Sequence, residues 1–242
     1  MTKGSLRWLA LALLWPLLPT QPGIALAADL TAAELALQIE AAGDGRPELA
    51  DLDLSGLDLA GIDFKGADLR GSLLKGANLE GADLSGANLD LVILRDANLK
   101  GARLTGANAF QTVFSGADLA GADLAGARVV AKFERANLAG ANLTGAVMAA
   151  DMTNQSMGLL RAHLTKANLK GARLAGAALA RCTAEFADFS DADLQGADLS
   201  RCELAGADFS GANLAGADFT DADLQQARFE GAIGRAQAIG LD

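Results

Sequence analysis

The apolar positions of this chain recur every five residues. From residue 57 to residue 89 a large apolar side chain occupies each fifth position, here termed the centre of a repeat, at Leu59, Phe64, Leu69, Leu74, Leu79, Leu84 and Leu89. Ala usually stands two positions before a centre, Asp or Asn one position before it, and Gly two positions after it. A period of five fits neither the alternation of a strand nor the helical period of about 3.6, so the pattern predicts a repeat structure.

Stacked coils would explain the spacing. If each pentapeptide turns the chain by about 90°, centres 20 residues apart stack at the strand spacing of about 4.8 Å. The centre and the residue two before it then point into a narrow tube, and Gly two after the centre suits a tight corner. The centres run without a break from Leu49 to Val129, with Ala109 as the small exception.

Near-copies of one pentapeptide fill most of the chain. Examples are Gly66-Ala67-Asp68-Leu69-Arg70, Gly81-Ala82-Asp83-Leu84-Ser85 and Gly196-Ala197-Asp198-Leu199-Ser200. These residues resemble pentapeptide-repeat proteins, and the resemblance covers roughly residues 47 to 239. It implies an all-β fold, a right-handed quadrilateral parallel β-helix with four pentapeptides per coil. We assign this β-helix, with a short C-terminal cap, to residues 47–242.

The five-residue phase breaks once, in the middle of the chain. Only four residues separate the centres Val129 and Phe133, and the original phase returns from Leu159. Residues 149–158 fit the repeat badly, so we expect a bulge or short loop there. This irregular segment represents either drift in a tolerant scaffold or a bend or loop that contacts a partner.

Residues 1–27 have the features of a cleaved signal peptide. Two basic residues precede an apolar run, Trp8 to Leu18, that is too short to span a bilayer, and Ala25-Leu26-Ala27 offers a cleavage site. An uncleaved amphipathic anchor is the alternative, although three prolines would interrupt its helix. We therefore expect export to the periplasm or an equivalent lumen, or secretion, with no membrane span in the mature chain.

Residues 28–46 are expected to form an N-terminal capping helix and a linker. Thr31 and Glu34 have the spacing of a capping box for a helix over residues 30–43, and Gly43 suits its C-terminal turn. A helix this short is marginal alone, so it should dock on the open end of the repeat array and cover it.

The charge balance bears on the choice of partner. The chain has 30 acidic and 20 basic residues, a formal net charge of −10 that becomes −12 if cleavage removes Lys3 and Arg7. Binding to nucleic-acid backbones depends on clustered Lys and Arg, so we expect no direct nucleic-acid partner.

Stacking also predicts columns of aromatic side chains inside the tube. Phe189, Phe209 and Phe229 fall at equivalent inward positions on successive coils, and Phe114 and Phe133 do so if the slip preserves the side of the coil. Such columns are expected to be core, stabilised by ring stacking.

Two cysteines should also stack inside the tube. Cys182 and Cys202 each stand two before a centre, so their Cα atoms should lie about 4.8 Å apart, within the range of a disulfide. Export favours a bond, whereas parallel Cβ vectors and the small size of Cys favour two free core thiols. The sequence leaves both possibilities open.

Catalytic constellations are missing from the sequence. The one histidine, His163, precedes the centre Leu164 and should face outward, and the serines have no partner base. Asp and Asn recur too uniformly to mark one metal site and are explained by hydrogen bonds to local backbone. We therefore expect no enzymatic activity, no cofactor and no metal.

One group of apolar residues falls at outward positions, where the repeat mostly carries Asp, Asn or Arg. They are Leu73, Ile93 and Val113 on one side, with Leu91, Phe110 and Val130 on the adjoining side. A contiguous apolar patch of a few hundred Å² usually marks an interface. We expect these residues to bind another protein or a second copy of the chain, unless a loop of the chain covers them or they reflect slack in the repeat.

The interpretation that fits these features best is an exported, non-enzymatic scaffold that mediates protein–protein interaction. The alternative comes from the family resemblance, because some pentapeptide-repeat proteins are acidic DNA mimics whose rod shape binds a type II topoisomerase. Topoisomerases are cytoplasmic, so this alternative requires that residues 1–27 are not a signal.

Overall fold

The computed structural model of this chain describes residues 29–43, 45–150 and 160–241. The expected signal peptide, residues 1–27, lies outside the described residues, as does most of the irregular segment 149–158. Two helical elements occur within the described ranges, α2 at Ala32–Ala42 and the 3-10 helix η2 at Arg235–Gln237.

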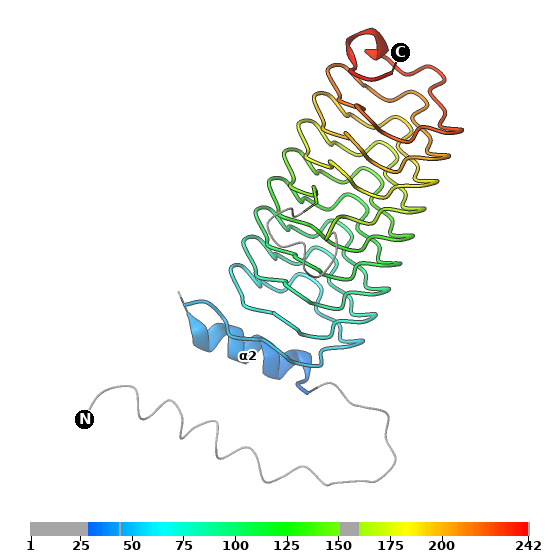
Figure 1. The fold of residues 1–242 in the computed structure, drawn as a ribbon. Helices are drawn as coiled ribbons and strands as arrows, with labels where there is room; N and C mark the ends of the chain where they lie inside the picture. Colours follow the sequence, from blue (N-terminus) through cyan, green and yellow to red (C-terminus); the bar gives the residue numbers. More distant parts are fainter. Residues whose placement is uncertain (1–28, 44, 151–159, 242) are drawn as a thin grey trace, which may run out of the picture.

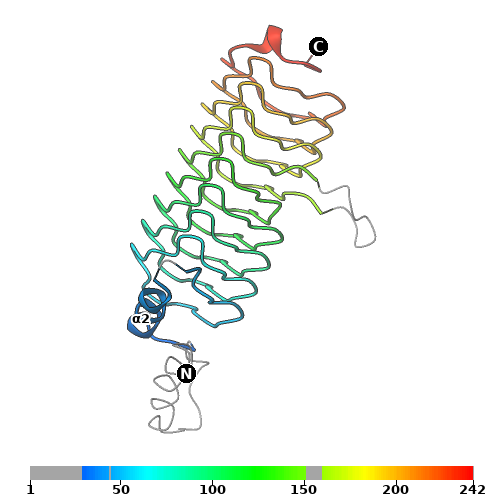
Figure 2. The same ribbon diagram turned by 90° about the vertical axis from the view of Figure 1, so that its left-hand side faces the viewer.

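The chain between these elements winds into a solenoid whose coils stack along one axis (Figures 1 and 2). Parallel β-bridges join each coil to the next, and in regular coils the bridged residues are 20 apart, as in Asp68 with Asn88. This spacing confirms the stacking predicted from the period of five. Within the described residues no strand extends beyond a single bridge, because the chain turns after every pentapeptide.

The bridges form four columns, one on each side of the coil. We name the sides in chain order and each corner by the two sides that it joins. Side A runs from Glu48 to Ile239, side B from Asp53 to Asp223, side C from Asp58 to Arg228, and side D from Asp63 to Ile233.

Backbone hydrogen bonds follow the same repeat. The N–H of the centre Leu69 donates to the carbonyl oxygen of Asn88 on the next coil at 2.9 Å, and the N–H of Asn88 donates back to Ala67 at 2.9 Å. A turn closes the corner, where the N–H of Ser72 donates to Leu69 at 3.0 Å. Buried backbone groups thus find partners without extended strands.

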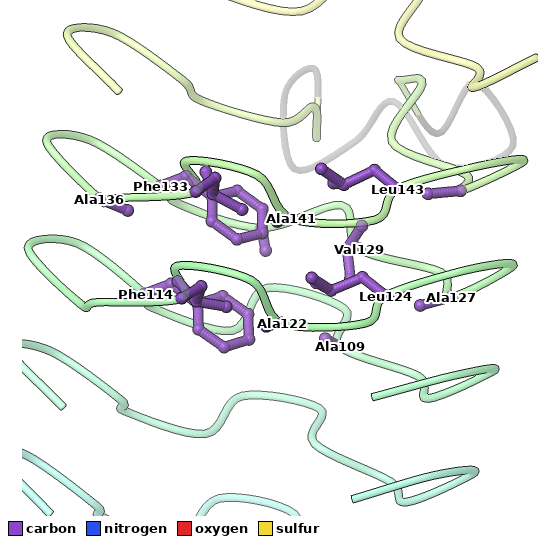
Figure 3. Close-up of a cluster of buried hydrophobic side chains, with 14 of the residues drawn as sticks. Ala109, Phe114, Ala122, Leu124, Ala127, Val129, Phe133, Ala136, Ala141 and Leu143 are labelled. Carbon is purple, nitrogen blue, oxygen red and sulfur yellow. The ribbon is translucent and has the colours of Figure 1, made fainter. Parts of the chain in front are cut away.

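The tube interior is mostly aliphatic, with stacked aromatic rings at two places. Phe114 and Phe133 stack with centroids 4.9 Å apart and an interplanar angle of 3° (Figure 3). Phe209 stacks on Phe189 at 5.0 Å and on Phe229 at 5.1 Å. Both predicted columns are confirmed, and the slip between Phe114 and Phe133 keeps the two centres on side B.

Helix α2 covers the N-terminal end of the solenoid (Figure 1). Its first turn has a capping box, in which the Glu34 N–H donates to Thr31 Oγ1 at 3.2 Å and the Thr31 N–H donates to Glu34 Oε2 at 2.8 Å. Leu35 is fully buried in the core, and Ile39 packs against it. Apolar burial of one helix face therefore holds a helix that would be marginal alone.

The C-terminal end is covered less completely. After the last coil, η2 turns the chain back so that Ile239 bridges Asp218, and the Arg235 guanidinium lies 5.1 Å from the centre of the Phe229 ring. Leu224 and Phe229, both inward centres, stay partly exposed.

The irregular region alters one corner on two neighbouring coils. Bridges on side B join Val113 to Lys132, 19 residues on, and Lys132 to His163, 31 residues on. One coil has therefore lost a residue and the next has gained eleven, both at corner A–B. The sequence predicted one deletion and one insertion, but phase counting in steps of five does not distinguish one extra residue from eleven. Leu159, where we expected the phase to return, lies outside the described residues.

Candidate protein-interaction face

Side B departs from the repeat more than any other side. Its outward column reads Asp53, Leu73, Ile93, Val113, Lys132, His163, Thr183, Glu203 and Asp223. The column of side C, by contrast, holds only Asp and Asn apart from one terminal Arg. No other column has three successive apolar rungs among the described bridges. We call Leu73, Ile93 and Val113 the apolar ladder.

The Asp or Asn that the repeat usually carries at these positions accepts a local hydrogen bond from the backbone. The Asp63 carboxylate accepts the Lys65 N–H at 2.9 Å, and the Asp188 carboxylate accepts the Ser190 N–H at 2.8 Å. Such local bonds explain why Asp and Asn recur beside the corners, as predicted. Leu, Ile and Val have no acceptor, so the apolar ladder gives up these bonds on three successive coils.

Backbone strain gathers at the two corners that flank side B. Among the described residues, twelve residues other than Gly have a positive φ, and eleven of them lie at corners A–B and B–C. The exception is Asp191, at corner C–D. The eleven are Asp51, Leu91, Asp96, Gln111, Arg135, Lys166, Arg181, Phe186, Arg201, Asp221 and Gln226. The left-handed conformation costs a side-chain-bearing residue about 1 kcal/mol or more, and such strain clusters at functional surfaces.

The structure joins the three residues of the apolar ladder by direct bridges, Leu73 to Ile93 and Ile93 to Val113. Leu73 is 41% exposed, while Ile93 and Val113 are half-buried between their neighbours. Leu91 is 57% exposed at corner A–B, beside the ladder. Phe110 is half-buried at the same corner, with the Arg128 guanidinium 4.5 Å from its ring centre.

Val130 is not a surface residue, and its predicted place in the apolar patch was wrong. Its side chain is only 3% exposed. The missing residue at corner A–B draws Val130 directly into the turn before Ala131, so the usual outward position no longer exists there. The predicted patch is therefore reduced to the apolar ladder and two residues at corner A–B, Leu91 and Phe110. We call Leu91 and Phe110 the ladder flank.

Charged residues of opposite sign border the two ends of the apolar ladder. Below it, Asp29 continues side B by one rung, because its N–H donates to Asp53 O at 2.7 Å and its carboxylate accepts the Asp53 N–H at 2.6 Å. Above it lie exposed Lys132 and then His163, whose Nδ1 is 3.0 Å from Thr183 Oγ1. Burial lowers the pKa of His163. The sequence did not reveal this order of acidic, apolar and basic rungs, because Asp29 lies outside the repeat and is placed by its hydrogen bonds to Asp53.

The corner above the ladder contains a cavity of about 50 Å³ between Gln111, Lys132, Arg161 and His163. The Arg161 guanidinium is held by Glu203 at 2.9 Å and by the Arg181 carbonyl at 3.3 Å. A space of this size is far below the several hundred Å³ of a small-molecule site. The chemistry of side B is therefore that of a flat contact surface.

The two cysteines lie inside the tube on side B, one coil apart. Both are fully buried free thiols, with their sulfur atoms 2.7 Å apart, and Cys202 Sγ donates to the Leu179 carbonyl at 3.1 Å. Burial and the neighbouring Cys202 raise the pKa of the Cys182 thiol. The stacked inward placement matches the sequence expectation, and the structure holds the unbridged form.

Two further features concern only the described residues. Within them, no group of three or more His, Cys, Asp or Glu side chains is arranged to hold a metal ion. In the same ranges, neither helix is long and apolar enough to cross a membrane.

These features define a class of protein, a β-solenoid of stacked four-sided coils with one side that departs from the repeat. Eight copies of the pentapeptide-repeat family model match residues 48–85, 72–108, 93–129, 131–150, 159–196 and 197–233. The chain therefore belongs to the pentapeptide-repeat family. No curated protein compared with the chain matches it.

Several solved structures are similar to this chain. HetL, a pentapeptide-repeat protein involved in heterocyst differentiation regulation in the cyanobacterium Nostoc, is 31% identical over 87% of this chain and 94% of its own, with a TM-score of 0.38. QnrB1, a plasmid-mediated fluoroquinolone resistance protein, is 20% identical over 74% and 92%, with a TM-score of 0.36. A pentapeptide-repeat protein of the Arabidopsis thaliana thylakoid lumen is 27% identical over 65% and 68%, with a TM-score of 0.18.

Proposed function

We propose that this protein is an exported, non-enzymatic scaffold that binds another protein through side B. The observation that carries the proposal is the apolar ladder, three adjacent outward rungs of Leu, Ile and Val on a scaffold whose outward rungs are otherwise mostly polar. Exposed apolar residues that form a contiguous surface are typical of interfaces, whereas isolated ones need no explanation.

The local energetics of side B support this use. At the ladder the chain forgoes the Asp or Asn hydrogen bonds of the repeat, and at corner A–B it holds Leu91 in a left-handed conformation at a φ of 63°. Both departures lower the stability of the isolated solenoid, yet both place apolar side chains outward. A partner that removes these side chains from water would offset the loss at about 25 cal/mol per Å² of apolar surface buried.

Export and coil geometry form part of the same proposal. Residues 1–27 carry the basic start, apolar core and small-residue site of a signal peptide, so we expect a mature chain that starts near Ala28. Mass spectrometry of the protein from an exported fraction checks this. We also infer a right-handed coil with a square cross-section, as the family implies and as four columns of bridges support.

The distribution of charge argues against a DNA mimic. A mimic needs a continuous acidic surface in place of the phosphates, but residues 128–177 hold seven Lys or Arg and two Asp or Glu, a net charge of +5. This basic band lies midway along a chain whose overall net charge is −10. An acidic duplex surrogate would be interrupted at the middle of its length.

The test compares a variant of the interaction face with a matched variant elsewhere. Ile93→Asp combined with Phe110→Ser removes the centre of the ladder and one residue of the flank. We expect this variant to lose association, as read from pull-down from the exported fraction and from sedimentation, with a melting temperature within a few degrees of wild type. Both positions are outward, so folding should not depend on them.

Val147→Asp is the control, because Val147 is 44% exposed on side A and lies away from the ladder. It should associate as wild type does. If the double variant still forms the same complexes as wild type, side B is not the interaction face and the proposal fails.

A further inference from the structure

The charges on side B are arranged in a self-complementary order. Counted outward from Ile93, the rungs on one side are Leu73, Asp53 and Asp29, and those on the other are Val113, Lys132 and His163. Apolar rungs thus surround Ile93, an acidic pair ends the series at one side, and the cation Lys132, followed by the half-buried His163, ends it at the other. If a second copy of this column is turned end to end, its apolar rungs lie opposite apolar rungs, and Asp53 of each copy lies opposite Lys132 of the other.

We propose that the occupant of side B is a second copy of this chain, bound antiparallel about a two-fold axis through Ile93. The inference rests on the proposed function and names its partner. In this arrangement Ile93 meets Ile93, Leu73 meets Val113, and Asp53 of each copy meets Lys132 of the other. An interface in which the same surface serves both copies is the usual form of a two-fold dimer.

Other alignments of the same two faces are electrostatically worse. A parallel pair with equal rungs in contact sets Lys132 against Lys132 and Asp53 against Asp53, and like charges in contact cost several kcal/mol. Moving the antiparallel axis by half a rung toward Leu73 sets Asp53 against Val113, which desolvates a carboxylate against an apolar side chain. Of these three alignments, only the axis through Ile93 gives every rung a compatible partner.

The ladder flank fits the same axis. Corner A–B of one copy faces corner A–B of the other, so Leu91, level with Ile93, meets Leu91. Phe110, one rung higher, lies opposite the corner formed by Arg70 and Gly71. The Asp51 carboxylate fills the space beside Gly71, so the Phe110 ring would face Arg70 at this corner.

The size of the contact sets the expected affinity. The overlap runs over seven rungs from Asp29 to His163, a length of about 29 Å at the strand spacing of about 4.8 Å. With a width of about three extended residues plus corner A–B, about 13 Å, each copy covers roughly 400 Å², about half of a standard interface. We therefore expect a dissociation constant in the micromolar range, so the dimer should form at tens of micromolar protein.

Cysteine cross-linking tests the axis directly. Ile93→Cys should form a covalent dimer under mild oxidation at about 50 µM protein, because the two side chains meet on the axis. Leu73→Cys and Val113→Cys should each stay monomeric alone and form a mixed dimer when combined. Two controls measure cross-linking that does not depend on side B: wild type, whose two native cysteines are buried, and Asp123→Cys, which places a cysteine on side D.

Charge exchange tests the same contact without cross-links. Asp53→Lys and Lys132→Asp should each weaken the dimer at least tenfold in sedimentation equilibrium, and the double variant should return to within about threefold of wild type. Cross-linking of Leu73→Cys or Val113→Cys alone, without the mixed product, would show a parallel pair and overturn the proposal.

A further result separates this inference from the proposed function. If wild type stays monomeric at 100 µM while Ile93→Asp with Phe110→Ser still abolishes capture of another protein, side B is an interface but its occupant is not a second copy. A wild-type dimer that Ile93→Asp leaves intact would also overturn the inference, because the contact would then lie on another surface.

Discussion

At the scale of single residues, the position within the pentapeptide decides whether a side chain is packed or solvated. The centre and the residue two before it are buried throughout the middle coils, as Leu143 and Ala141 are (Figure 3). The position just before the centre forms the outward column of bridged residues. Cys182 and Cys202 follow this rule because both stand two before a centre. Their chemistry is therefore that of two core thiols stacked in the tube.

We expect both thiols to be unreactive in the folded protein and both to be available after unfolding. Full burial excludes reagents, and the raised pKa of Cys182 keeps its reactive thiolate scarce at neutral pH. The measurement is thiol titration of unreduced protein before and after addition of denaturant. The absence of any titratable thiol in the denatured, unreduced protein would show that the two cysteines are bridged. Their sulfur atoms lie 2.7 Å apart, so a small rotation of either side chain could bring them to the bond length of about 2.05 Å.

At the scale of one coil, the corners decide how far the repeat can vary. A corner tolerates a residue other than Gly at some cost in backbone strain, and eleven of the twelve such described residues flank side B. The same corner, A–B, tolerates both the lost residue after Val129 and the eleven added residues after Met148. Corners B–C and C–D keep the five-residue spacing on every described coil, so the two length changes in the middle of the chain are confined to corner A–B.

Leu91→Gly should separate stability from association. Gly removes the strain of the left-handed conformation, so we expect the free energy of unfolding in urea to rise by up to about 1 kcal/mol. Association through side B should weaken, because the exposed apolar side chain beside the ladder is lost.

Gln226→Gly is the matched control, since Gln226 has a φ of 59° at corner B–C of the last full coil. It should gain similar stability and leave association unchanged. If Leu91→Gly associates as tightly as wild type, Leu91 has no part in the contact.

At the scale of the whole molecule, carboxylates beside the corners couple stability to pH. The Arg70 guanidinium lowers the pKa of Asp68, and the Thr220 hydroxyl and N–H lower that of Asp218. A carboxylate with a lowered folded-state pKa holds fewer protons folded than unfolded. Its contribution is present above the unfolded pKa of 3.8 and is lost as pH falls through the lower folded value.

Asp68→Asn combined with Asp218→Asn should therefore reduce the loss of stability below about pH 4. Asn occupies the same column at Asn88 and Asn108, so the substitution suits the coil. The measurement is the urea midpoint from pH 7 to pH 2.5. Asp58→Asn with Asp63→Asn, on sides C and D, is the control for removal of two charges, and equal curves for the two double variants would contradict the assignment.

Local spacing alone determined much of this protein. The period of five fixed which side chains point inward, the column of Phe189, Phe209 and Phe229, and the apposition of Leu73, Ile93 and Val113, because a pentapeptide makes one turn and four turns make one coil. These are short-range consequences of corner geometry and of the room inside the tube. They hold wherever the repeat is regular.

Only the tertiary structure decided what happens where coils meet. It buried Val130, whose outward place vanished when the corner closed over a missing residue, and it set Asp29 under Asp53, where it extends side B. It also fixed the size of the insertion, eleven residues at corner A–B. Counting in steps of five does not reveal whole added repeats, because ten extra residues leave the phase unchanged. The pairing of residues between coils reveals them.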